Sequence, residues 1–189
     1  ISPNGYILTA AHVIKDANRV IVVMEETQEF RASVVQADYE MDVAVLKISA
    51  TNLTWLSLGN SDQVQYEQEI RVLGYPLPGH AGVGFAAVGG RIQGFRTSHG
   101  IRLLQHDAPT EGGHSGGPVI NAQGEIIAVH VGWIGGEHAK YTIGVAINSA
   151  RKIIPQGAIP LEPSPVSRPS YPVLPRRVIK VPDDVPSLK

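Results

Sequence analysis

Short runs of apolar and β-branched residues recur along the first four fifths of the chain, and each run is closed by Gly, Asn, Asp or Pro. Such runs predict strands, and many short strands with turn residues between them indicate a β-sandwich or a β-barrel. The predicted strands are residues 6–9, 20–24, 30–36, 43–48, 70–73, 85–95, 101–106, 118–120, 126–131 and 142–147. The pattern therefore predicts an all-β domain.

Only two segments have a helical pattern, residues 10–16 and residues 149–154. The first would be a single turn, and the second would close the domain near Ile154. A domain of about 150 residues buries roughly 70% of the surface that its unfolded chain exposes, so it needs no metal or disulfide for stability. We expect one domain followed by a tail.

The character of the chain changes after Ile154. Nine of the 14 prolines lie between Pro155 and Pro186, at spacings that should prevent a helix or a paired strand from persisting. Residues 155–189 are therefore predicted to form an extended, Pro-rich tail or linker. The two P-x-x-P strings, at 160–163 and 172–175, could bind proline-recognition modules, but a simple spacer is the more common use of such a segment.

Charge and composition exclude several classes of function. The formal net charge of −1 gives no basic footprint for nucleic acid, and no run of 18 apolar residues predicts a membrane span. The chain has no cysteine, so it forms no disulfide and uses no thiol chemistry. Its seven histidines show no H-x-x-x-H or H-E-x-x-H spacing, and no metal site is predicted.

Residues 112–118 read Gly-Gly-His-Ser-Gly-Gly-Pro, and His12 and Asp42 lie upstream of their serine, Ser115. A serine hydroxyl becomes a good nucleophile when an adjacent histidine takes its proton. A carboxylate that accepts a hydrogen bond from the far imidazole nitrogen fixes the ring. Each residue alone is more typical of a turn, a core histidine or a strand end. Together, in the order His, Asp, Ser, they favour a catalytic triad of the chymotrypsin type.

The glycines of this segment suit a second task. Backbone N–H groups of Gly113 and Ser115 would converge on the oxyanion that forms during attack on a peptide carbonyl. Residues without a Cβ allow the tight turn and the close approach of a substrate. The predicted oxyanion hole is therefore Gly113, His114 and Ser115.

Six ordered blocks of sequence carry a resemblance to a known family. They are residues 1–13, 42–48, 72–76, 107–110, 113–118 and 143–147. With them the chain resembles trypsin-like serine proteases of the HtrA/Deg type, and the match runs to about residue 154. The resemblance implies a chymotrypsin-like double six-stranded β-barrel over residues 1–154. The two barrels would lie at roughly 1–55 and 70–148, separated by the polar stretch 53–69.

The resemblance also implies a serine-type endopeptidase that uses no cofactor. His12 would be the base, Asp42 would orient it and Ser115 would be the nucleophile. Family members usually have asparagine where this chain has His114. An exposed substitution is the simplest interpretation, although the ring could alter the loop or add a pH-sensitive charge.

The beginning of the chain also departs from the family pattern. A leading segment with at least one strand precedes the motif of residues 1–12 in the family, so we expect the chain to begin inside its domain. The first barrel would then be incomplete and would leave an open sheet edge.

The resemblance predicts two segments that contact substrate. The residues are Thr110, Glu111, Gly112, His130, Val131 and Gly132. The first three would form a wall of the specificity pocket, and the last three would pair with the substrate backbone by β-addition. Pro109 stands six residues before Ser115, where trypsin has the acid that selects Lys or Arg. A small or medium apolar side chain before the scissile bond is expected, although the charge of Glu111 could face that pocket or solvent.

Two functions from different classes are consistent with these residues. The first is an ATP-independent serine endopeptidase that cleaves extended or unfolded polypeptides. The second is a catalytically silent, protease-like module that binds peptides. The complete His, Asp and Ser set favours the first, and the early start of the domain is the argument for the second. An α/β-hydrolase esterase is excluded because its triad order is Ser, acid, His.

The expected partner is a polypeptide substrate, with no nucleic acid and no membrane span. The family resemblance alone favours an extracytoplasmic or cell-envelope location. HtrA-type chains often continue into a PDZ domain, and a further domain could follow the tail, but no segment of this chain matches one. The sequence assigns no oligomeric state.

Overall fold

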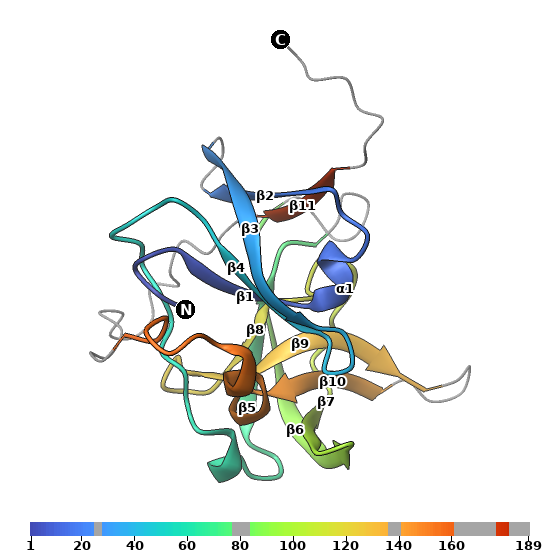
Figure 1. Cartoon of the computed structure of the whole chain (residues 1–189). Coiled ribbons are helices and arrows are strands. Elements are labelled where there is room, and N and C mark those ends of the chain that lie inside the picture. Colours follow the sequence, from blue (N-terminus) through green and yellow to red (C-terminus); the bar gives the residue numbers. More distant parts are fainter. Residues whose placement is uncertain (25–27, 77–83, 136–140, 161–176, 182–189) are drawn as a thin grey trace.

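The computed structural model describes residues 1–24, 28–76, 84–135, 141–160 and 177–181. Its strands form two units, a five-stranded sheet and a closed six-stranded barrel (Figure 1). The all-β, chymotrypsin-like fold predicted from the sequence is confirmed, and so is the incomplete first barrel, because the described strands of the first unit do not close.

The first unit has the strand order β1-β4-β3-β2-β11, and all neighbours are antiparallel. Its strands are β1 (Tyr6–Thr9), β2 (Arg19–Met24), β3 (Gln28–Asp38), β4 (Val43–Lys47) and β11 (Arg177–Val181). The last strand comes from the Pro-rich segment and pairs with β2, Arg177 opposite Val23 and Val181 opposite Arg19. The prediction that no paired strand persists after Ile154 is therefore wrong for residues 177–181, which contain no proline.

The P-x-x-P strings lie almost wholly outside the described residues.

The second unit is a barrel with the strand order β10-β7-β6-β5-β8-β9. Its strands are β5 (Glu69–Gly74), β6 (Ala86–Ser98), β7 (Ile101–His106), β8 (Pro118–Ile120), β9 (Ile126–Ile134) and β10 (Tyr141–Ala146). The ten strands predicted from the sequence correspond to β1–β10, with ends that differ by up to three residues. Strand ends differ because pairing with a neighbour extends a strand past its apolar run.

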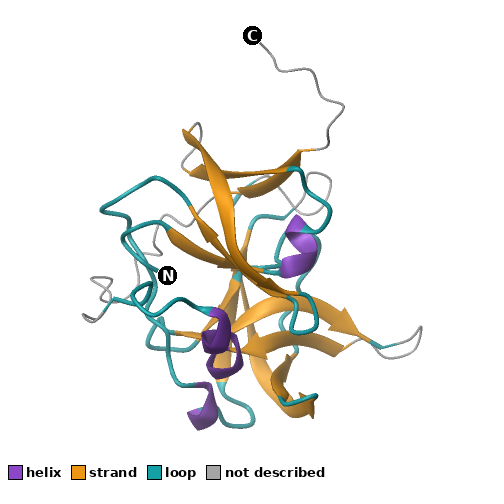
Figure 2. Ribbon diagram, viewed as in Figure 1, coloured by secondary structure: helices purple, strands orange, loops and turns teal. Residues whose placement is uncertain are grey.

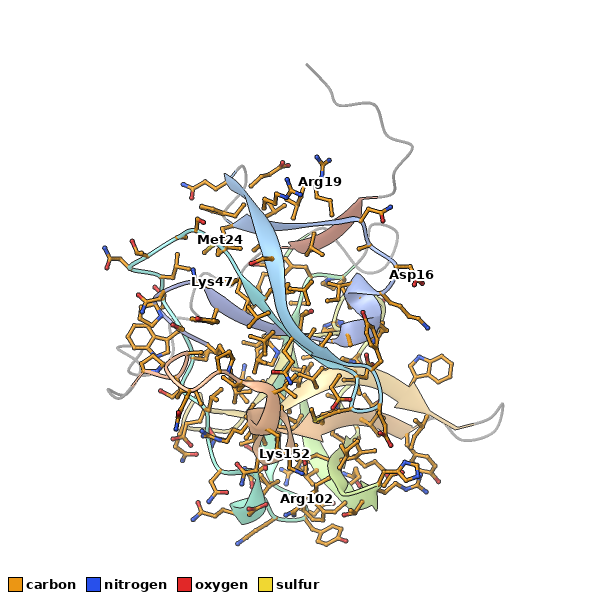
Figure 3. All side chains as sticks on the ribbon, in the orientation of Figure 1. Asp16, Arg19, Met24, Lys47, Arg102 and Lys152 are labelled. Carbon is orange, nitrogen blue, oxygen red and sulfur yellow. The ribbon has the colours of Figure 1, made fainter. Side chains whose placement is uncertain are left out.

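Helices are few and short, as Figure 2 shows. They are the α-helices α1 (Ala11–Ile14) and α2 (Ile147–Ala150) and the 3-10 helices η1 (Ser61–Gln63) and η2 (Arg151–Ile153). Helix α1 follows β1 directly, and α2 with η2 closes the barrel domain. The segment between the units contains η1, whose Asp62 accepts a hydrogen bond from Arg102 at 3.2 Å. Arg102 lies at the periphery of the barrel, whereas Asp16 and Arg19 lie at that of the sheet (Figure 3).

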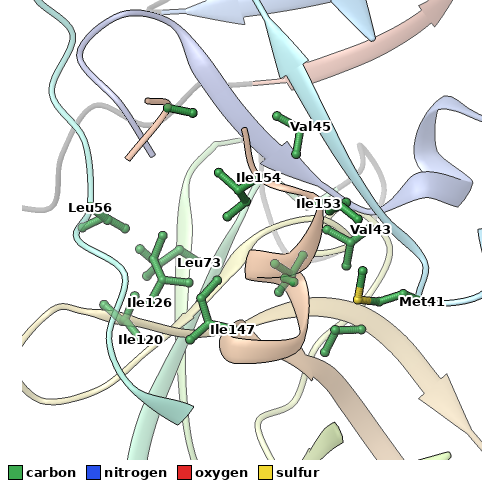
Figure 4. Close-up of a cluster of buried hydrophobic side chains, with 14 residues drawn as sticks. Met41, Val43, Val45, Leu56, Leu73, Ile120, Ile126, Ile147, Ile153 and Ile154 are labelled. Atoms are coloured by element: carbon green, nitrogen blue, oxygen red, sulfur yellow. The ribbon is translucent and has the colours of Figure 1, made fainter. Parts of the chain in front are cut away.

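Strand β4 joins the two units because it is buried on both faces. Successive side chains of a strand point to opposite faces. Ala44 and Leu46 pack into the core of the sheet, and Val43 and Val45 pack into a cluster shared with the barrel. That shared cluster includes Leu73, Ile147 and Ile153 (Figure 4). Burial on both faces explains the continuous apolar run of β4, and it fixes the residue before the strand, Asp42, relative to the barrel.

Candidate active site

His12 and Asp42 come together because their strands are antiparallel neighbours. Strand β1 pairs with β4, with Thr9 opposite Ala44. The chain that leaves β1 toward His12 and the chain that enters β4 from Asp42 therefore lie at the same end of the strand pair. The carboxylate of Asp42 then makes two contacts with His12. Its Oδ1 accepts a hydrogen bond from the backbone N–H of His12 at 2.7 Å, and its Oδ2 lies 2.6 Å from Nδ1 of the ring.

The backbone of Asp42 is held in an unusual conformation. Its φ is +59°, in the left-handed region that Asp tolerates better than most side chains. Its carbonyl accepts a hydrogen bond from the N–H of Ala11 at 3.2 Å. Carboxylate and carbonyl together satisfy two N–H groups at the start of α1, which have no acceptor within the helix itself. Asp42 thus fixes the first turn of the helix as well as the ring of His12.

The contact between His12 and Asp42 sets the tautomer of the imidazole. An ionised carboxylate only accepts hydrogen bonds, so Nδ1 of His12 donates to Asp42 and Nε2 is left as the acceptor in the neutral ring. The two side chains are 46% and 28% exposed, respectively. A half-exposed neutral imidazole whose Nε2 is an acceptor can take a proton from a neighbouring hydroxyl group.

The loop that carries Ser115 consists of two consecutive turns. The N–H of His114 donates to the carbonyl of Glu111 at 3.2 Å, and the N–H of Gly117 donates to that of His114 at 2.9 Å. The third residues of these turns are Gly113 (φ +100°) and Gly116 (φ +82°). Positive φ at the third position alone is typical of type II turns and explains why glycine stands there. Ser115 occupies the second position of the second turn.

Contacts on both sides hold this loop in place. Gly116 N–H donates to the carbonyl of His130 at 2.7 Å, and His130 N–H donates to Gly117 at 2.9 Å, which attaches the loop to β9. A Cβ at Gly116 would lie 2.8 Å from the backbone nitrogen of Ala10 and would also contact the Thr9 side chain. The loop therefore packs directly against the residues that lead into α1. The fold brings the segments of His12, Asp42 and Ser115 to one place.

His114 is buried, and the prediction of an exposed substitution is wrong. A Cβ at Gly74, the last residue of β5, would lie 2.9 Å from its ring, so the glycine makes room for the imidazole. Its Nδ1 lies 3.1 Å from the carbonyl oxygen and 3.3 Å from the nitrogen of Glu111, whereas its Nε2 has no protein partner. The ring thus packs beneath the loop and supports its first turn.

Two further histidines, His106 on β7 and His130 on β9, are each 2% exposed. Burial lowers the pKa of His106 to about 4, partly opposed by the charge of Asp107. Burial also lowers the pKa of His130 to about 3, and the neighbouring His106, His114 and His12 add to this effect, while a backbone hydrogen bond at Ile143 opposes it. Both rings are therefore neutral at pH 7.

The predicted substrate-binding residues fall into two segments. Thr110, Glu111 and Gly112 lie between β7 and β8, directly before the turns, and the first two are half-buried. Val131 and Gly132 follow His130 on β9 and are also half-buried. Strand β10 pairs with Gly132 and with His130 but skips Val131. This irregularity marks a β-bulge next to the loop of Ser115.

Three residues that the sequence did not single out contribute to this region. Thr9 packs against Gly116, Tyr75 N–H donates to the Gly113 carbonyl at 3.2 Å, and His106 lies beside His130. Strand alternation could have identified His106, because it places this residue on the same face as the core residue Leu104. The contacts of Thr9 and Tyr75 join residues distant in sequence and leave no local signal.

Within the described part of the chain, no group of three or more His, Asp or Glu side chains is arranged to hold a metal ion. Among the same residues, no helix is both long and apolar enough to cross a bilayer.

Residues 1–129 match the sequence model of the trypsin-like peptidase domain. Two relatives are probable periplasmic serine endoproteases described as DegP-like. The one from Chlamydia pneumoniae is 36% identical over 82% of this chain and 33% of its own length, and the one from Halomonas elongata is 34% identical over 69% and 27%. The HtrA-type protease AlgW, solved with a decapeptide, has a TM-score of 0.71 and 30% identity over 81% of this chain and 48% of its own. The chain thus spans about a third of the length of these curated relatives.

Proposed function

Because the chain belongs to the trypsin-like peptidase family and to its HtrA type, we propose that it acts as a serine endopeptidase. The bond between His12 Nδ1 and Asp42 Oδ2, at 2.6 Å, is the observation that carries the proposal, because it presents the free Nε2 as a base. The loop of Ser115 packs against the residues that precede α1, and this contact supports Ser115 as the partner of that base.

The proposed reaction begins when Ser115 Oγ attacks the carbonyl carbon of a peptide bond. A C–O bond forms, the Oγ proton passes to Nε2 of His12, and the carbonyl oxygen becomes an anion. When this intermediate collapses, the C–N bond breaks and His12 gives the proton to the leaving amine. Water then repeats the sequence on the ester of Ser115, which releases the acid and restores the hydroxyl group.

Asp42 would act through the ring of His12. Its carboxylate holds the Nδ1–H tautomer and stabilises the imidazolium that exists while the proton is on Nε2. Because Asp42 also binds the backbone N–H of His12 and Ala11, the ring and its helix are oriented by a single residue. This preorganisation limits the reorientation needed during proton transfer.

The turns of residues 111–117 would supply the oxyanion hole. The N–H groups of Gly113 and Ser115 are its expected donors, and His114, the residue between them, anchors the loop from below. Removal of one such donor costs about 3–4 kcal/mol of transition-state stabilisation in comparable sites.

The proposed substrate is a polypeptide in an extended conformation. The bulge of β9 at Val131 leaves a backbone position that β10 does not pair, which suits β-addition of a peptide next to Ser115. The solved AlgW structures carry peptides, and the relatives named above are described as periplasmic. We extend both properties to this chain, as a peptide-cleaving enzyme outside the cytoplasm.

A serine-reactive phosphonate tests this function. We expect the protein to gain the mass of one adduct on the peptide that contains Ser115, and we expect His12→Ala to abolish the labelling. A folded protein that stays unlabelled but still binds an extended peptide would instead be the silent binding module.

A further inference from the structure

A second aspartate lies at the other end of the loop that carries Asp42. Residues 39–42 connect β3 to β4, and Asp38 is the last residue of β3. Oδ1 of Asp38 accepts hydrogen bonds from the backbone N–H groups of Glu40, at 3.0 Å, and of Met41, at 2.8 Å. A single carboxylate oxygen therefore holds two of the N–H groups of this short loop.

These two bonds fold the chain back directly before Asp42. An aspartate that accepts from the N–H groups two and three residues further on forms a turn with its own side chain. Hydrogen bonds to an ionised acceptor are about twice as strong as those between neutral groups. The course of the loop thus depends on the side chain of Asp38 as well as on the pairing of β3 with β4.

Met41 is fixed from two sides, and it is the residue directly before Asp42. Its N–H is bonded to Asp38, whereas its side chain is 4% exposed and packs in the cluster shared with the barrel (Figure 4). Asp42 follows with a φ of +59°. A residue with a side chain keeps such a sparsely populated conformation only where the surrounding structure holds it. The anchored Met41 is one such constraint.

The conformation of Asp42 matters because its carboxylate bonds His12 in two places. Oδ1 lies 2.7 Å from the backbone nitrogen and Oδ2 lies 2.6 Å from Nδ1 of the ring. Hydrogen bonds weaken steeply when their angle departs from the preferred range. A small rotation of the Asp42 backbone would therefore disturb both contacts and, with them, the orientation of the imidazole.

We propose that Asp38 is a positioning residue for the reaction, which acts through Asp42 by holding the turn that leads into it. The inference rests on the proposed endopeptidase function. Asp38 is not itself catalytic in this scheme. Its carboxylate fixes Glu40 and Met41, the turn fixes the backbone of Asp42, and Asp42 fixes the ring of His12.

The alternative is that the turn only stabilises the β3–β4 hairpin. The chain offers a matched control for this case in Asn121, which follows β8. Its Oδ1 accepts from the backbone N–H groups of Gln123, at 3.0 Å, and of Glu125, at 2.9 Å. The same type of side chain to backbone turn therefore joins β8 to β9, but no triad residue follows it.

The first test measures peptide cleavage by single variants of the full chain. Asp38→Ala removes the acceptor and should lower kcat by about 10-fold to 100-fold with little change in KM, because small misplacements of a catalytic group have effects of this size. Asp38→Asn keeps Oδ1 and should restore most of the rate. Asn121→Ala should leave kcat unchanged. A wild-type kcat in Asp38→Ala, or an equal loss in Asn121→Ala, would overturn the proposal.

A double-mutant cycle with Asp42 tests the path of the effect. If Asp38 acts through Asp42, then Asp38→Ala should cause no further loss of kcat in an Asp42→Asn protein, since coupled residues are not additive. Independent effects would multiply instead. A 10-fold or larger further loss in the double variant would show that Asp38 supports the fold in general and does not position Asp42.

A measurement without turnover separates this proposal from the endopeptidase function. The proton between His12 Nδ1 and Asp42 should give a strongly downfield NMR signal in the wild type. The signal should be weakened or lost in Asp38→Ala, return in Asp38→Asn, and stay unchanged in Asn121→Ala. An unchanged signal in Asp38→Ala would contradict the positioning role.

The combined outcomes distinguish the two levels. If the wild type cleaves peptides but Asp38→Ala is equally active, the positioning role is wrong and the endopeptidase function stands. If the wild type neither cleaves nor reacts with the phosphonate, the function is wrong, and the NMR signal alone decides whether Asp38 holds Asp42 and His12. If Asp38→Ala fails to fold, Asp38→Ser replaces it, because its hydroxyl group forms a weaker turn of the same kind, and a loss of several-fold is expected. A wild-type kcat in Asp38→Ser would then overturn the proposal.

Discussion

His12 with Asp42 and His106 with His130 show how one residue type is given opposite properties in two regions of this chain. The ring of His12 lies at the edge of the open sheet, is 46% exposed, and bonds a carboxylate at 2.6 Å. The rings of His106 and His130 lie in the closed barrel, are 2% exposed, and have three nitrogens without a protein partner. The first arrangement favours proton transfer, whereas the second holds a neutral hydrogen-bonding group.

The cause of this difference is solvent access rather than the residue itself. A half-exposed imidazole beside an anion can carry charge at little cost, because water and carboxylate both stabilise it. A buried imidazole loses its hydration when charged, so its pKa falls. The buried pair therefore resists protonation until acid pH, whereas the exposed ring of His12 suits the proton transfer of the proposed reaction.

The largest expected effect comes from His12. His12→Ala should lower kcat by about 10⁶-fold, as loss of the base does in other serine proteases, while thermal stability changes little because the side chain is half-exposed. Single-turnover cleavage of a peptide measures the first quantity and a melting curve the second. A His12→Ala variant that keeps a tenth of the wild-type kcat would contradict the role of His12 as the base. A variant that unfolds would contradict the expectation that His12, unlike the buried pair, contributes little to stability.

Asp42 sharpens the contrast because its expected part in the reaction is to hold the ring of His12. Asp42→Asn should lower kcat by about 10⁴-fold, since the amide can donate to Nδ1 and so favours the wrong tautomer. Asn also tolerates the positive φ of this position, so the fold is preserved. The pH dependence of kcat/KM provides the readout, and an unchanged rate at pH 7 would contradict the role of Asp42.

Acid should destabilise the barrel through the buried pair. Below about pH 6.5 the unfolded chain protonates its histidines, but folded His106 and His130 stay neutral until about pH 4 and about pH 3. Stability is therefore retained above pH 6.5 and lost as the pH falls. Between pH 6.5 and pH 4 each histidine should reduce the free energy of unfolding by about 3 kcal/mol.

Urea unfolding of the wild type and of a His106→Leu/His130→Leu variant, measured at several pH values, tests this expectation. Carboxylates and other histidines contribute equally in both proteins, so the difference in slope isolates the buried pair. Parallel curves for the two proteins would show that the pair does not stay neutral in the fold.

The smallest effect is expected at a fourth histidine, His99. Its Nδ1 lies 3.1 Å from Glu40, but both side chains are more than two thirds exposed. Exposed ion pairs contribute about 0–1 kcal/mol, so Glu40→Ala should leave activity unchanged and stability nearly so. A loss of activity in Glu40→Ala would contradict this expectation, because it would mean that the exposed pair of His99 and Glu40 takes part in function.

The sequence predicted much of this architecture because strand signals are local. Ten strands and the two short helical segments could be read from apolar runs and turn residues. The strand β11 could not, because residues 177–181 are a short stretch with two cations in a Pro-rich segment, and their pairing with β2 depends on a partner more than 150 residues away.

The predicted site residues show the same division. His12, Asp42 and Ser115 were chosen by residue type and order, and Gly113 because a residue without a Cβ allows a tight turn and close approach of a substrate. The burial of His114 was missed, because its neighbour Gly74 is remote in sequence and offers space only in the folded barrel. The meeting of His106 and His130 was missed for the same reason.

The sequence by itself determined which groups the protein has available: a serine between glycines, a histidine, a carboxylate and an all-β chain to carry them. These are matters of residue chemistry and local conformation. The tertiary structure decided the environment of each histidine, exposed beside a carboxylate or buried beside another imidazole. It did so because burial and pairing depend on contacts between distant strands, and these contacts set whether an imidazole can be charged.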